Sequence, residues 1–390
     1  MLMLPFSQAP KFLTRPRRVP GLHVVRQLPS EMVAGSTYTW EVSFVNPKRD
    51  TLLMNILLEI SAQDIYVGFN EFMLEGTLES WNIRPFQHHS YKLKFKEISN
   101  GTFLSIGIVK ERFNHLRLRI SSVPNLYPGT YTFSLSVKLF QVELGQAEKL
   151  KKAIEYLIRQ FNPQIQLCAE APRVAPNTYW LVSDNLWAYK ALENYAPEIS
   201  NAIKSKLIEL ASAYNLPTDH QGLPISFKHE AVLGDIVPTP FNVTVSYTLY
   251  SDDYTLKTDI ANGTAVMEDW QKYADLLLYA TLSRHWEGKE EEALELFNMA
   301  KNMWDGVGLN DSYAREKGYY ATYKLALLLY TSKVLGQKLP FEEELIVTIF
   351  KMQDQETGGI LTDYYPNGQP VEYADANTET TSIMIIALTI

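Results

Sequence analysis

The feature that most constrains the fold of this 390-residue chain is a change in its hydrophobic period near Gln141. Before that point apolar and polar residues alternate, as in TYTFSLSVKL from Thr130 onward, and TYTWEVSF and HLRLRI repeat the pattern. Alternation with a period of two indicates half-buried strands. After it, apolar residues recur at the spacing of an amphipathic helix, as in Ile154, Leu157, Ile158 and Phe161. We therefore expect a β region followed by an α region.

Turn signals divide the β region into several short strands. They include Asn46-Pro47, Asn100-Gly101 and Tyr127-Pro128-Gly129. Short strands without an intervening helix predict an antiparallel β-sandwich over residues 21–142, after an extended segment at 1–20. The phrase LYPGTYTFSLSV resembles the last hairpin of an immunoglobulin-like domain.

The α region, expected at 146–390, contains one interruption. Val243, Val245, Tyr247 and Leu249 alternate before a polar turn, which predicts a β-hairpin inserted near 241–260. The apolar spacing elsewhere predicts further helices at about 182–195, 266–286, 290–303, 316–335, 341–353 and 377–390.

Composition excludes several classes of partner and cofactor. The net charge is -8, and the basic residues cluster only at Arg15, Arg17 and Arg18, which argues against nucleic acid as a ligand. The single Cys168 excludes an intrachain disulfide and a multi-cysteine metal site, and we expect neither metal nor cofactor. No apolar run here is long enough for a membrane span or a secretion signal. The sequence leaves open an extracellular or cell-surface location and the oligomeric state.

A repeated arrangement organises the α region. Each copy has an apolar helix, a long polar loop, an entrance rich in aromatic and acidic residues, and a more apolar second helix; the copies span 153–192, 293–329 and 345–388. MQDQETGGILTDYY followed by DANTETTSIMIIAL resembles a hairpin of the α/α-toroid superfamily, which includes six-hairpin glycosidases and terpenoid cyclases. The resemblance covers about 146–390, and the pairing with a sandwich is similar to uncharacterised archaeal surface proteins.

The resemblance implies a central funnel rimmed by the loops that enter the inner helices. We count four helical hairpins rather than six, so a partial ring is expected. The acidic DxDD motif of terpenoid cyclases is absent, because Tyr250 stands where its first Asp would be. A terpenoid cyclase is therefore excluded.

Carboxylates and aromatic rings at the helix entrances are the candidate site residues. Rings stack on the apolar face of a sugar, carboxylates accept its hydroxyl protons, and glycoside hydrolysis needs two carboxyl groups. The catalytic candidates are Asp184, Glu230, Glu268, Asp269, Asp375 and Glu379. The substrate-binding candidates are Tyr179, Trp180, Asn185, His229, Trp270, Tyr273, Tyr319, Tyr320, Tyr323 and Asn377.

Structural roles compete with these functional ones. Asp184 is placed to cap the helix that follows, and Glu268 and Asp269 suit the first turn of a helix. His229 and Glu230 form a base and acid pair in a loop, and they lack the spacing of a zinc protease. Two functions stay open: a glycoside hydrolase or polysaccharide lyase, and a non-catalytic surface or scaffold protein that binds glycan or protein.

Overall fold

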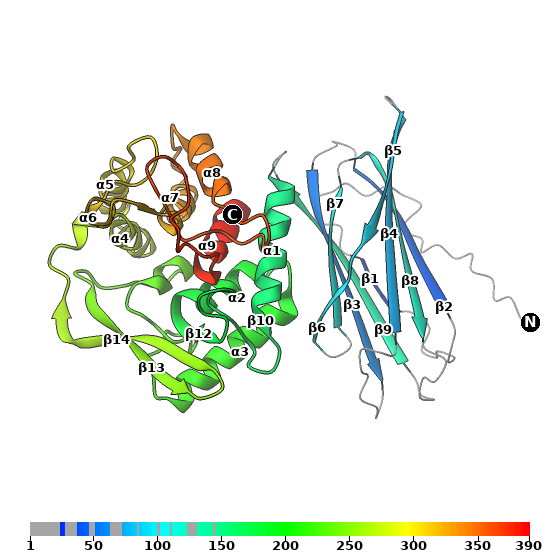
Figure 1. Ribbon diagram of the computed structural model, residues 1–390, viewed down its shortest axis with the longest axis horizontal. Helices are drawn as coiled ribbons and strands as arrows, with labels where there is room; N and C mark the ends of the chain where they lie inside the picture. The colour runs from blue at the N-terminus through cyan, green and yellow to red at the C-terminus, as the bar shows by residue number, and fades with distance from the viewer. Residues whose placement is uncertain are drawn as a thin grey trace, which may run out of the picture. The chain divides into compact units, whose positions relative to one another are not determined.

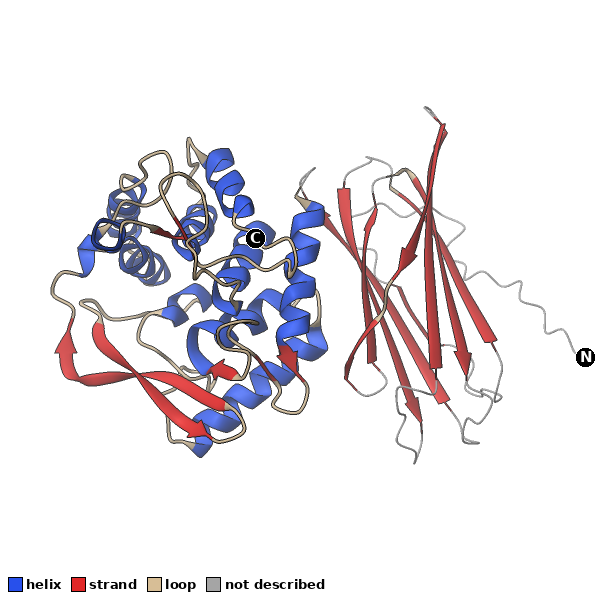
Figure 2. Ribbon diagram, in the orientation of Figure 1, coloured by secondary structure: helices blue, strands red, loops and turns tan. Residues whose placement is uncertain are grey.

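The computed structural model describes residues 24–27, 37–46, 51–62, 72–83, 86–99, 102–109, 111–122, 131–142 and 146–390. The chain divides into two compact units, residues 1–151 and 152–390. The first is built mainly from antiparallel strands and the second mainly from helices (Figures 1 and 2). This confirms the predicted order of a β region and then an α region. The expected extended segment at 1–20 lies outside the described residues.

Nine described strands of the first unit pair into two antiparallel sheets. One sheet has the order β1 (Val24–Gln27), β9 (Tyr131–Val142), β3 (Thr51–Ala62), β7 (Thr102–Val109) and β6 (Lys96–Ser99). The other has the order β2 (Thr37–Val45), β8 (Phe113–Ser122), β4 (Phe72–Ile83) and β5 (Phe86–Leu93).

The alternation seen in the sequence decides which side chains of these strands are buried. In β2, Trp40, Val42 and Phe44 are buried while the residues between them are exposed. The same alternation holds in β8 and in the middle of β9. Because a strand places successive side chains on opposite faces, every second residue reaches the core. The buried side chains of both sheets belong to a single hydrophobic cluster.

The helices of the second unit fall into two groups by burial. Those buried on nearly every face are α2 (Leu186–Leu192), α4 (Ala274–Trp286), α7 (Thr322–Val334) and α9 (Thr378–Thr389). Those that bury one face are α1 (Ala147–Gln160), α3 (Pro197–Ala213), α5 (Glu290–Lys301) and α8 (Glu342–Lys351).

We call the first group the inner helices. They pack as neighbours in the order α2, α9, α7 and α4 (Figure 1). A helix that is apolar all round must be covered by others, which explains this layering. Despite their apolar character, none of the helices in the described ranges has the combination of length and hydropathy that a membrane crossing requires.

The inserted hairpin is present as β13 (Asn242–Ser251) and β14 (Thr255–Val266), which pair antiparallel. The predicted helix start at 266 is wrong. Val266 pairs with Asn242 and stays extended, and α4 begins only at Ala274 after a short 3-10 turn at Trp270–Lys272.

The predicted helix at 316–335 is divided. The short helix α6 (Ser312–Lys317) ends at Gly318, which has a φ of 78° that favours glycine. The strand β15 (Tyr320–Ala321) then pairs with β16 (Asp363–Tyr364), and α7 begins directly afterwards.

Candidate functional site

Polar side chains gather at the N-terminal ends of the inner helices, within an otherwise apolar layer. We call this group the helix-entrance cluster, and it consists of Asp184, His229, Asp275, Tyr279, Tyr323 and Glu379. Contacts join His229 to Glu379 and to Tyr279, and Tyr323 to Asp275. Asp184 is connected to the cluster by the effect of the Glu379 charge on its pKa. The sequence predicts Asp184, His229, Tyr323 and Glu379 as site residues, and the structure brings these four together.

A strained turn presents Asp184 at the start of α2. Ser183 has a φ of 62° and a ψ of -81°, a combination that a residue with a side chain rarely adopts and that costs about 1–3 kcal/mol. Asn185 holds this turn. Its amide donates to the carbonyl oxygens of Trp180 (2.6 Å) and Cys168 (3.0 Å), and its Oδ1 accepts from the Cys168 N–H at 2.7 Å. Asn185, predicted to bind substrate, is fully buried and acts on the backbone instead.

The carboxyl group of Asp184 is buried and only partly hydrogen-bonded. Ser183 donates to its Oδ1 at 3.1 Å, whereas Oδ2 has no hydrogen-bond partner among the described residues. The Asp184 side chain therefore does not cap α2. Burial raises the pKa of Asp184 well above its usual value, and the charges of Glu379 and Glu170 raise it further. Asp184 thus keeps its proton when Glu379 is ionised.

Glu379 lies in the first turn of α9, and this turn is tied to the segment that leads to α2. Asn377 caps α9 by accepting from the Thr380 N–H at 2.9 Å. Thr378 donates through its N–H to the Glu170 carbonyl (2.9 Å) and through its hydroxyl to the Ala169 carbonyl (2.6 Å). These bonds set Glu379 beside Asp184.

Burial raises the pKa of Glu379 to about 7, although 22% of its side chain is exposed. The positive charge of Lys228 opposes this rise, while Asp259 and Asp275 add to it. A carboxyl group with this pKa exchanges its proton near neutral pH, as acid–base catalysis requires.

Three aromatic side chains from three inner helices hold the segment that carries His229. Trp187 of α2 donates to the His229 carbonyl (3.2 Å) and Trp286 of α4 to the Ala231 carbonyl (2.8 Å). Tyr330 of α7 donates to the Val232 carbonyl (2.7 Å). The short 3-10 helix His229–Leu233 is thereby fixed against α2, α4 and α7.

The His229 ring is oriented towards Glu379. Its Nδ1 lies 2.8 Å from the Ser226 hydroxyl, and its Nε2 lies 3.9 Å from Glu379 Oε1. The Ser226 hydroxyl donates its single proton to Glu230 Oε2 (3.4 Å). The Ser226 hydroxyl thus bridges His229 Nδ1 and Glu230, and it fixes the orientation of the imidazole ring.

Burial and the nearby Lys228 charge lower the pKa of His229 well below its usual value, so the ring is neutral at pH 7. Glu230, a predicted catalytic residue, lies behind the ring and accepts from the Ser226 N–H at 3.2 Å. Its role is to orient Ser226 and through it His229.

Tyr279 extends the cluster into α4. Its ring packs edge-on against His229, with centroids 5.4 Å apart. Its hydroxyl is buried without a hydrogen-bond partner among the described residues. Burial and the charge of Glu379 raise its pKa, so it stays a neutral phenol. Buried polar atoms are nearly always hydrogen-bonded, so Tyr279 Oη and Asp184 Oδ2 retain unused bonding capacity.

Sequence reasoning missed a buried lysine that supports the cluster. Lys324 Nζ lies 2.9 Å from Asp275 Oδ1 and 2.6 Å from Asp311 Oδ2, and Tyr323 donates to Asp275 Oδ2 at 2.7 Å. Burial alone would lower the pKa of Lys324, but the two aspartates outweigh it and the pKa is raised. The available signal was a single charge inside the apolar run TYKLALLLY.

Besides Glu230, three of the predicted catalytic carboxylates lie outside the cluster. Asp375 accepts through Oδ2 from the N–H groups of Arg173 (2.8 Å) and Val174 (3.1 Å), so it holds a loop. Glu268 and Asp269 are exposed, and Asp269 lies 3.8 Å from Lys272. Asp375 therefore stabilises a loop, and Glu268 and Asp269 are exposed to solvent.

The predicted aromatic residues divide into separate groups. Trp180 donates to Glu170 at 2.8 Å. Glu170 and Glu379 are the two carboxylates whose charges raise the pKa of Asp184. Tyr179 is buried, and its hydroxyl accepts from Asn162 at 3.0 Å. The others have different neighbours: Trp270 packs on Phe241, Tyr273 faces Lys324, Tyr320 stacks on Tyr364, and Tyr319 contacts Tyr313, Tyr365 and Tyr373.

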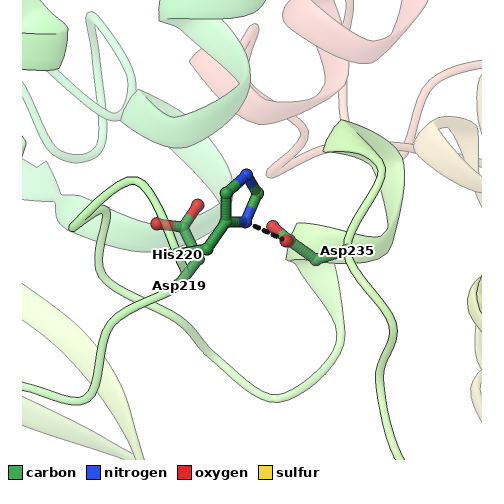
Figure 3. A group of neighbouring side chains, drawn as sticks. All are labelled: Asp219, His220 and Asp235. Carbon is green, nitrogen blue, oxygen red and sulfur yellow. Dashed lines mark hydrogen bonds and ion pairs between the residues drawn. The ribbon is translucent and has the colours of Figure 1, made fainter.

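Asp219, His220 and Asp235 form a separate group with the composition of a metal site (Figure 3). Three ligand atoms lie within 4.8 Å of one another, and His220 Nδ1 is 3.0 Å from Asp235. Asp219 Oδ1, however, accepts from the N–H groups of Gln221 (2.7 Å) and Leu223 (2.8 Å), and 73% of the His220 side chain is exposed. The group is accounted for as a surface turn with an ion pair.

The helix-entrance cluster combines two carboxyl groups of raised pKa, a neutral imidazole and a buried phenol. A charge on Glu379 holds the proton on Asp184, which is how paired carboxyl groups divide into an acid and a base. The arrangement therefore suits proton transfer to and from a neutral ligand. No protein-family model matches this chain, and a search of curated proteins finds no match.

Proposed function

We propose that this protein is a carbohydrate-active protein that cleaves a glycosidic bond with Asp184 and Glu379, at the helix entrances of a partial α/α-toroid. In this proposal α2, α4, α7 and α9 are the inner helices of the toroid, and the two sheets of the first unit form an immunoglobulin-like sandwich. The observation that carries it is the buried Asp184 carboxyl group, whose Oδ2 has no hydrogen-bond partner among the described residues and whose pKa the charge of Glu379 raises.

The two carboxyl groups are assigned different roles by their surroundings. Asp184 acts as the general acid, because burial and the charge of Glu379 keep it protonated. Glu379 acts as the base or nucleophile, because Lys228 stabilises its ionised form. Glycoside hydrolysis uses such a pair, in which one group protonates the leaving oxygen and the other supports attack on the anomeric carbon.

His229 is assigned a positioning role. Its Nε2 lies 3.9 Å from Glu379 Oε1, so the imidazole borders the carboxyl group without a direct hydrogen bond to it. The contact of Nδ1 with the Ser226 hydroxyl, which also bonds Glu230, holds the ring in this orientation.

A carbohydrate fits this site better than a charged ligand. Sugar hydroxyls both donate and accept, so they satisfy the free Asp184 oxygen and the Tyr279 hydroxyl. Tyr323, whose ring is partly exposed, adds an aromatic side chain near the carboxyl groups, the combination found in sugar sites. The net charge of -8 also disfavours polyanions.

The test is cleavage of a panel of neutral and acidic polysaccharides by the wild type, Asp184→Asn and Glu379→Gln. Release of reducing ends by the wild type, with a loss of at least about 100-fold in both variants, is the expected result. Glu268→Gln, an exposed carboxylate outside the cluster, serves as control and should retain full activity. Equal activity in all four proteins would refute the assignment.

The pH dependence supplies a second test. Activity should rise as the pH increases through about 7, where Glu379 ionises, and fall at higher pH when Asp184 loses its proton. A rate that is highest well below pH 7 would contradict the two roles.

A non-catalytic glycan-binding protein is the second candidate. It is favoured by the structural roles of Asn185, Asp375 and Asn377, which hold loops and caps where one catalytic and two substrate-binding residues are predicted. In that case calorimetry would detect saccharide binding that Asp184→Asn weakens, while no product forms in any protein.

A further inference from the structure

Four tyrosines from two loops meet around Tyr319, outside the helix-entrance cluster. The ring centroid of Tyr319 lies 5.8 Å from that of Tyr313, 6.5 Å from that of Tyr365 and 6.0 Å from that of Tyr373, each in an edge-on arrangement. We call these four residues the tyrosine platform. Tyr313 and Tyr319 come from α6 and the residues after it, and Tyr365 and Tyr373 follow β16. The platform therefore forms only when these two segments pack together.

A buried layer holds the two loops together. Tyr320 and Tyr364 are paired in the β15–β16 ladder, and their ring centroids are 5.4 Å apart. The Tyr320 hydroxyl donates to Asp305 at 2.5 Å and the Tyr364 hydroxyl to the Val307 carbonyl at 2.8 Å. Because these two rings are buried and anchored, the platform has a fixed support.

The platform is partly open to solvent and has carboxylates at its edge. Tyr373 is 59% exposed, and Tyr313, Tyr319 and Tyr365 are half-buried. Tyr365 donates to Glu372 at 2.7 Å, and Tyr313 donates to Asp363 at 3.4 Å. Exposed aromatic rings with carboxylates beside them present both stacking surface and hydroxyl acceptors to a sugar ring.

A chain of contacts connects the platform to the helix-entrance cluster. The Tyr313 ring centroid is 4.9 Å from Lys324 Nζ, and Lys324 reaches Asp275 at 2.9 Å. Asp275 accepts from Tyr323 at 2.7 Å, and its charge acts on Glu379. The platform therefore lies on the same side of the inner helices as the acid pair.

We propose that the tyrosine platform is a second sugar-binding subsite, which stacks a residue of a saccharide chain whose scissile bond lies at Asp184 and Glu379. This inference rests on the proposed function and makes it more specific, because a substrate of the protein is then an oligosaccharide or polysaccharide rather than a single glycoside. Tyr373 and Tyr365 supply the stacking faces. Glu372 accepts from the sugar hydroxyls.

The experiment measures binding as a function of chain length. Soluble oligosaccharides from the disaccharide upward, prepared from whichever polysaccharide of the panel is bound or cleaved, are titrated calorimetrically into Asp184→Asn protein, which binds without turnover. The same titration is made with Tyr373→Ala, Tyr365→Ala and Tyr373→Phe added to that background. Tyr247→Ala removes a tyrosine that is 50% exposed on β13 and provides the matched control.

In the expected result, affinity increases with chain length, and each alanine variant weakens the longer ligands about threefold to tenfold while leaving the disaccharide unchanged. Tyr373→Phe keeps the stacking face and should bind like the parent. Equal affinities of the parent and the alanine variants at every length would overturn the platform and leave the acid pair intact. Failure of the wild-type protein to bind or cleave any saccharide of the panel would overturn both.

Discussion

Replacing Glu379 with Gln should change how the stability of the helical unit depends on pH. The pKa of Glu379 is raised from an ordinary 4.5 to about 7, so the folded protein binds this proton more tightly than the unfolded chain does. The stabilisation is fully present below the unfolded pKa of 4.5 and is lost as the pH rises through about 7. Glutamine has no ionisable proton, so Glu379→Gln lacks this dependence.

The magnitude follows from the same shift. One pKa unit corresponds to about 1.4 kcal/mol, so a rise from 4.5 to about 7 is worth roughly 3 kcal/mol. Because 22% of the side chain is exposed and solvent screens its charge, we expect about 2 kcal/mol. Relative to Glu379→Gln, the wild type should lose this amount of unfolding free energy between about pH 4 and about pH 8.

Urea unfolding of both proteins over that pH range, followed by tryptophan fluorescence, measures the difference directly. Glu268→Gln is the control, because Glu268 is exposed and lies outside the cluster. A constant difference between wild type and Glu379→Gln at all pH values would show that Glu379 ionises at the same pH in the folded and unfolded chain. That outcome would remove the physical basis of the proposed role of Glu379 as a base.

Three further substitutions test the support around the site. Lys324→Met leaves Asp275 and Asp311 buried without their cation and should destabilise the protein by about 3–5 kcal/mol in urea unfolding; a loss below about 1 kcal/mol would contradict this. Asp375→Ala removes the acceptor of two backbone N–H groups and should cost about 1–3 kcal/mol while leaving the pH profile of any cleavage unchanged. Gly359→Ala would place a Cβ 2.7 Å from the Tyr156 ring, and an unchanged melting temperature would refute that close approach.

The sequence predicts much of the architecture because hydrophobic period follows directly from backbone geometry. The alternation of apolar residues at Trp40, Val42 and Phe44 is enough to predict that these side chains are buried, as they are. The hairpin at β13 and β14 is recognisable for the same reason. Helix starts are less predictable: Ser183 and Val266 lie in patterns that suit a helix, but a strained turn and a strand pairing override them.

Within the cluster, His229 is predicted because it adjoins an acid in a loop. Asp184, Tyr323 and Glu379 are predicted because each lies close in sequence to a helix entrance. Asp375 and Asn377 satisfy the same pattern, yet they bind backbone groups, and only three-dimensional contacts distinguish the two cases. The roles of Lys324 and Tyr279 depend on neighbours from other elements of the fold. A lone charge within an apolar run marks Lys324 as unusual, but it does not identify the partners of that charge.

The hydrogen bonds of Thr378 to residues 169 and 170 make the candidate site a late product of folding. The hydroxyl bond to Ala169 closes a separation of 209 residues, so Glu379 meets Asp184 only after the last helix has docked on the segment before α2. Contacts this distant in the chain form slowly, because the intervening loop entropy must be overcome first. A chain assembled in this way does not bring its two carboxyl groups together until α9 has docked, so a partly folded chain lacks the candidate site.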